Sequence, residues 1–83
     1  MKNVRMQFDL PEKKMDELDA LMARCDITTK KELFSYALSM LEWAVSESEQ
    51  GHDIAAIDRE TKQFFSLRMP VLSAAKRHAL SDR

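Results

Sequence analysis

Two short groups of residues in the first part of the chain carry side chains suited to binding another molecule. Asn3, Arg5 and Gln7 stand at alternate positions, and arginine and glutamine can each form two hydrogen bonds to one planar group. Further along, Lys30 and Lys31 follow Thr29 at the expected start of a helix, where free backbone N–H groups favour an anion. These groups offer recognition chemistry rather than catalysis.

The residues that usually serve catalysis or metal binding are not arranged for either task. His52 and His78 have no cysteine or second histidine at ligand spacing, so we expect no metal site. The sequence contains no nucleophile–base constellation, glycine-rich phosphate loop or paired acid motif. Cys25 is the single cysteine, which fits a reducing cytosol, and we expect it to be a small buried residue. We therefore predict neither an enzyme nor a bound cofactor.

The first binding group lies on a segment with the period of a β-strand. Apolar and polar residues alternate from Asn3 to Leu10, which gives one dry face and one wet face. Pro11 ends the strand, because proline has no N–H for a ladder but fits the first position of a helix. A lone strand leaves its backbone groups unpaired. We therefore expect it to pair with the same strand of a second copy.

Two helical patterns follow this strand. The first runs from Pro11 to about Cys25, and Asp26 breaks it. The second begins with a capping-box pattern, Thr29 to Glu32, and ends at about Gln50 with Gly51 as the left-handed C′ residue. Its apolar stripe is wide enough to pack on its own chain and on another. The expected dimer core consists of Met6, Phe8, Leu33, Ala37, Leu38 and Leu41, and the aromatic residues Phe34, Tyr36 and Trp43 are expected in the core or the dimer interface.

The C-terminal part changes period again. Residues 53–69 contain two short β-like runs joined by a polar turn, which predicts a hairpin, and a short helix is expected over residues 70–80. This segment could extend the dimer, wrap a protein partner or pair with a partner's sheet edge. We rank extension of the dimer first, because Ile57, Phe65 and Leu67 need burial in every case.

Charge is distributed unevenly along the chain, although the net charge is only −1. Residues 32–60 carry seven acidic side chains and one basic, whereas residues 61–83 carry five basic and one acidic. The two ends are therefore the parts that an anionic partner would tolerate. No apolar run approaches the ~18 residues that span a bilayer, and no signal peptide precedes the strand. We expect a cytoplasmic protein with no membrane contact.

The order of these elements resembles the ribbon-helix-helix family of Arc, methionine and CopG-type repressors. The resemblance covers residues 3–47 approximately and rests on the strand with Pro11, the Thr29–Leu33 segment, and Ala37 and Leu38. It implies a mainly α fold with a short β-ribbon, built as an intertwined dimer over residues 1–51. Residues 52–83 are then a C-terminal, hairpin-like extension.

The resemblance also implies a function and its residues. A two-stranded ribbon from the dimer enters the major groove of DNA, where Arg5 and Gln7, with Asn3 beside them, would contact base edges. Arginine suits guanine and glutamine suits adenine. Thr29, Lys30 and Lys31 would hold a DNA phosphate at the start of the second helix. Asp9 departs from the usual pattern of this ribbon face, and we expect it to cap the first helix instead.

These inferences predict a homodimeric, sequence-specific transcriptional regulator, such as a repressor, whose dimers could pair into tetramers on DNA. The alternative is a protein-interaction module or antitoxin-like protein that keeps the fold and binds a protein partner through residues 53–69. The near-neutral charge and Asp9 favour this alternative.

Overall fold

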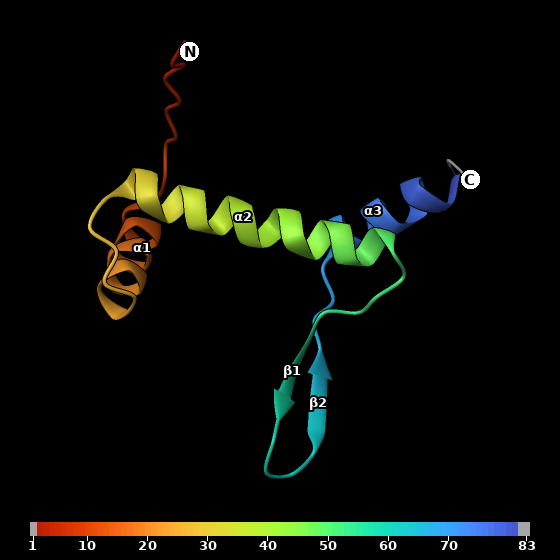
Figure 1. The fold of residues 1–83 in the computed structure, drawn as a ribbon. Helices are drawn as coiled ribbons and strands as arrows, with labels where there is room; N and C mark the ends of the chain where they lie inside the picture. Colours follow the sequence, from red (N-terminus) through yellow and green to blue (C-terminus); the bar gives the residue numbers. More distant parts are fainter. Residues whose placement is uncertain (1, 82–83) are drawn as a thin grey trace. The chain divides into compact units, whose positions relative to one another are not determined.

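The structure, a computed structural model, describes residues 2–81 and is mostly helical (Figure 1). Its helices and strands are α1 (Glu12–Arg24), α2 (Lys30–Glu49), β1 (Ala55–Asp58), β2 (Gln63–Ser66) and α3 (Pro70–Ser81). The two strands pair as one antiparallel hairpin. These bounds confirm the predicted helices to within a residue or two at each end, and they confirm the hairpin.

The chain divides into two compact units, Met1–Phe34 and Ser35–Arg83, and the division falls inside α2. The sequence pattern placed its boundary later, after Gly51, where the helix ends. A helix of 20 residues can belong to one unit at its start and to the other at its end, so its last residue need not mark a boundary.

In the first unit, α1 begins directly after Pro11. The Pro11 carbonyl accepts a hydrogen bond from the Met15 N–H at 3.1 Å, but no side chain caps the helix. The expected capping role of Asp9 is therefore wrong. The favourable charges remain, because Glu12 lies in the first turn and Arg24 in the last.

The end of α1 is a Schellman motif formed around Asp26. This residue has a positive φ of 56°, and the Ile27 N–H donates to the Met22 carbonyl at 2.9 Å. Met22 is buried and Ile27 is half-buried, as the apolar contact of this motif requires. Cys25, beside the turn, is exposed, so its expected burial is wrong for the single chain.

In the second unit, α2 ends with the same motif, this time around Gly51. Gly51 has a φ of +87°; its N–H donates to Ser48 at 3.0 Å, and the N–H of His52 donates to Glu47 at 2.9 Å. The two bonds satisfy carbonyls of the last turn that have no partner within the helix. The expected C′ role of Gly51 is confirmed.

The hairpin turn is stabilised by one aspartate. Oδ1 of Asp58 accepts hydrogen bonds from the backbone N–H groups of Glu60 at 3.0 Å and Thr61 at 3.3 Å, and Lys62 takes a positive φ of 64°. The register pairs Ile57 with Phe64 and Ala56 with Phe65. Facing residues of an antiparallel pair share one side of the sheet, so each side of the hairpin carries one phenylalanine.

One chain buries very little of its apolar surface. Among the described residues, the buried hydrophobic side chains are Met22, Ala44 and Leu72, and no side chain is fully buried. The residues expected in the core or the dimer interface are largely exposed, Phe34, Tyr36 and Trp43 among them. A domain of this size needs a larger core, a staple or a partner chain to be stable.

Candidate nucleic-acid interface

The N-terminal segment is extended and lies open to solvent. Residues 2–10 form neither helix nor strand within the single chain, and none of their backbone groups is hydrogen-bonded to another part of residues 2–81. The side chains of Asn3, Arg5 and Gln7 are exposed and form no hydrogen bond there. All the polar groups that could pair with a second strand or with a base edge are therefore free.

The apolar side chains of the same segment are exposed as well. Met6 is 64% exposed and Phe8 is 65% exposed, and Val4 and Leu10 also face solvent. An alternating strand normally hides one of its two faces. This one hides neither within its own chain, so the described residues do not supply the cover that its sequence pattern requires.

The start of α2 carries the second group of candidate residues. The Thr29 Oγ1 accepts a hydrogen bond from the Glu32 N–H at 3.1 Å, which is the forward half of the predicted capping box. The Leu33 N–H donates to the Thr29 carbonyl at 3.1 Å. The backbone N–H groups of Lys30 and Lys31 have no acceptor in the part of the chain that is described. Two donors are thus left at the positive end of a 20-residue helix.

The two lysine side chains differ in their surroundings. Lys30 Nζ lies 2.7 Å from Asp19 Oδ1, an ion pair in which both side chains are about half exposed. Lys31 is exposed and forms no ion pair with any residue from 2 to 81. The sequence analysis did not identify Asp19, because its position 11 residues before Lys30 follows no local pattern.

The proposed core residues of α2 lie at the surface of the single chain. Leu38 is 44% exposed and Leu41 is 41% exposed, Ala37 is exposed and Leu33 is half-buried. Spacings of three and four place Leu33, Ala37 and Leu41 along one side of the helix, and Leu38 lies about a quarter-turn around from that line. An apolar stripe in this state can cover a second chain.

Several other site types find no support in the described residues. No group of three or more His, Cys, Asp or Glu side chains is placed to hold a metal ion. No helix between residues 2 and 81 is both long and apolar enough to cross a bilayer.

Comparison with known proteins leaves the family open, because no family model, curated protein or solved structure matches the chain.

Proposed function

We propose that the protein is a homodimeric ribbon-helix-helix DNA-binding protein that regulates transcription. One observation carries the proposal: residues 2–10 are extended, alternate apolar with polar side chains, and lack any backbone partner in their own chain. Pairing with the same segment of a second copy satisfies these backbone groups and covers Met6 and Phe8.

The remaining parts of the proposed interface follow from this dimer. The paired strands form a ribbon narrow enough for the major groove, with Arg5 and Gln7 available to base edges and Asn3 beside them. The free N–H groups at the start of α2 hold a phosphate, and the Lys31 side chain adds positive charge. Leu33, Ala37, Leu38 and Leu41 pack between the two chains. The compartment that fits this function is the cytoplasm.

A second function is favoured by the hairpin. Ile57, Phe64 and Phe65 are all more than half exposed, and a two-stranded hairpin with both faces open is marginal by itself. A protein partner, as in antitoxin-like proteins, could cover these side chains and pair with a strand edge. In that function the N-terminal ribbon holds the dimer together without binding DNA.

Duplex DNA of random sequence distinguishes the two functions. A DNA-binding protein neutralises phosphates, so log Kobs falls with log salt by about 0.9 for each phosphate contacted. We expect measurable affinity at low salt and a reduced slope for Lys31→Ala. The control is Arg59→Ala, which removes the same charge from the hairpin turn and should leave the slope unchanged. A wild-type chain without salt-sensitive DNA affinity would refute the DNA-binding function and favour the protein-partner function.

A further inference from the structure

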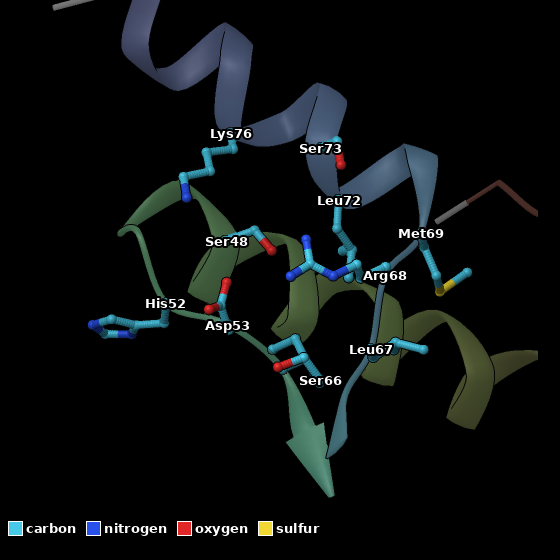
Figure 2. A pocket seen from close by; sticks show the side chains of 11 residues that line it. Ser48, His52, Asp53, Ser66, Leu67, Arg68, Met69, Leu72, Ser73 and Lys76 are labelled. Carbon is cyan, nitrogen blue, oxygen red and sulfur yellow. The ribbon is translucent and has the colours of Figure 1, made fainter. Parts of the chain in front are cut away.

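The second unit contains a small open pocket that the proposed DNA interface does not use (Figure 2). Its volume is about 150 Å³. The walls come from the end of α2, the connection from α2 to β1, the end of β2 with the connection that follows it, and the first turns of α3. The Leu67 N–H donates to the Ile54 carbonyl at 2.7 Å, which holds the two connections together beside the hairpin.

Ser48 is the buried polar residue of this unit, and it lines the pocket. It is only 6% exposed, yet its hydroxyl forms no hydrogen bond with any residue from 2 to 81. Figure 2 shows its side chain turned into the pocket. No side-chain polar atom of the described residues is both sealed and unpaired, so this hydroxyl is reached from the pocket. Buried polar groups normally have a partner, and a ligand in the pocket would supply one.

Two cationic side chains line the same space. Arg68 extends toward Ser48 in Figure 2, and Lys76 comes from α3 on another side. Neither forms an ion pair with a residue of the described part, although Asp53 also lines the pocket. The pocket therefore has two positive charges and one negative. The ring of His52 points away and lies 3.2 Å from Glu47 Oε1, so it is not directed at a ligand.

The chemistry and the volume together indicate the kind of ligand. A guanidinium, an ammonium and a hydroxyl all donate hydrogen bonds, and the excess positive charge suits an anion. A volume of about 150 Å³ is below the ~300 Å³ at which pockets for drug-sized molecules begin. It equals the liquid volume of roughly five waters, which is enough for a phosphate or carboxylate group on a small molecule.

We propose that this pocket binds a small oxyanion, a phosphate or carboxylate group, through Arg68, Lys76 and the hydroxyl of Ser48. Ser73, which also lines the pocket, adds a further hydroxyl. Asp53 limits the affinity, because its carboxylate repels the anion. The site does not depend on the DNA-binding function, since none of its residues belongs to the N-terminal segment or to the start of α2.

Amide chemical shifts of the full chain test the site during titration with inorganic phosphate and, separately, with acetate. Sodium chloride at matched ionic strength is the control for general salt effects. We expect saturable shifts confined to residues around Ser48, Arg68 and Ser73 with at least one of the two anions. The anion that binds more tightly identifies the ligand as a phosphate or a carboxylate compound. Shifts that are absent with both anions, or equal with chloride, would overturn the proposal.

Three variants make the test specific to these side chains. Arg68→Gln should weaken binding about tenfold and Ser48→Ala several-fold, whereas Asp53→Asn should tighten it. Arg59→Gln, in the hairpin turn, removes a positive charge outside the pocket and should leave the affinity unchanged. Equal losses in Arg68→Gln and Arg59→Gln would show that the binding is non-specific attraction. No change in any pocket variant would place the anion elsewhere.

Discussion

Lys30, the first residue of α2, is joined to Asp19 of α1 by an ion pair of 2.7 Å between Nζ and Oδ1. The pair ties the start of α2 to the preceding helix, and it also occupies one of the two lysine side chains at the proposed phosphate site. The neighbouring backbone N–H groups stay free. A phosphate at this helix end would therefore meet the backbone and Lys31 first, and would compete with Asp19 for Lys30.

Replacing Asp19 separates these two effects. Asp19→Asn should cost at most about 1 kcal/mol in unfolding free energy, because exposed ion pairs contribute little. It should also tighten DNA binding, since Lys30 is released and one negative charge is removed. Asp16→Asn is the matched control, as it removes a charge from the same helix without breaking an ion pair. Urea unfolding and DNA titration measure both quantities, and equal DNA affinities for the two variants would contradict a role for Lys30.

The turn at Gly51 should be sensitive to a single added methyl group. Gly51→Ala should lose about 1 kcal/mol of unfolding free energy, because alanine disfavours the φ of +87° found there. A Cβ at this position would meet no atom within 4 Å, so any loss reflects backbone strain alone. The companion variant Asp26→Gly, also at positive φ, should cost less than Gly51→Ala. The reverse order in denaturant melts would contradict this explanation.

Local signals explain why the elements could be predicted from the sequence. Pro11, the Thr29–Glu32 pattern, Gly51 and Pro70 each act within a few residues, so helix bounds follow from the chain itself. The role of Asp9 was predicted wrongly, because the α1 N-terminus uses no side-chain cap. The burial of Cys25 was also wrong, since helical periodicity shows which face is apolar but not whether anything covers it.

The candidate sites divide in the same way. Thr29, Lys30 and Lys31 share one helix end and were found from sequence, whereas the pocket joins Ser48, Arg68 and Lys76 across gaps of 20 and 8 residues. No periodicity links these three positions. The dimer core stays a prediction, because it depends on contacts with a second chain.

The oligomeric state can be tested through unfolding. If folding requires association, the unfolding midpoint must rise with protein concentration, and sedimentation must show a dimer under folding conditions. We expect both results, because the described residues of one chain fully bury no side chain. A folded monomer whose stability does not depend on concentration would contradict the dimer.

The buried face of α2 gives a sharper contrast. Leu38→Ala and Leu41→Ala should each cost about 2–5 kcal/mol if these side chains pack between two chains. Their exposure in the single chain, above 40%, predicts a much smaller loss if no second chain covers them. Ser39→Ala is the control on the polar side of the same helix and should change stability by less than about 0.5 kcal/mol. Small losses in both leucine variants would place the dimer contacts elsewhere.

The measurement that tests the proposed ribbon most directly is the selection of preferred duplex sites by wild-type protein, Arg5→Ala and Lys31→Ala, with the salt dependence of each. Arg5→Ala should lose about 1–3 kcal/mol and relax the preference at one base position in each half-site. Lys31→Ala should weaken all sequences alike and lower the salt slope by about one unit. Gln7→Ala should change the preferred base without changing the slope. If Arg5→Ala keeps the wild-type base preference while DNA binding persists, the ribbon does not read the bases, and the central proposal is wrong.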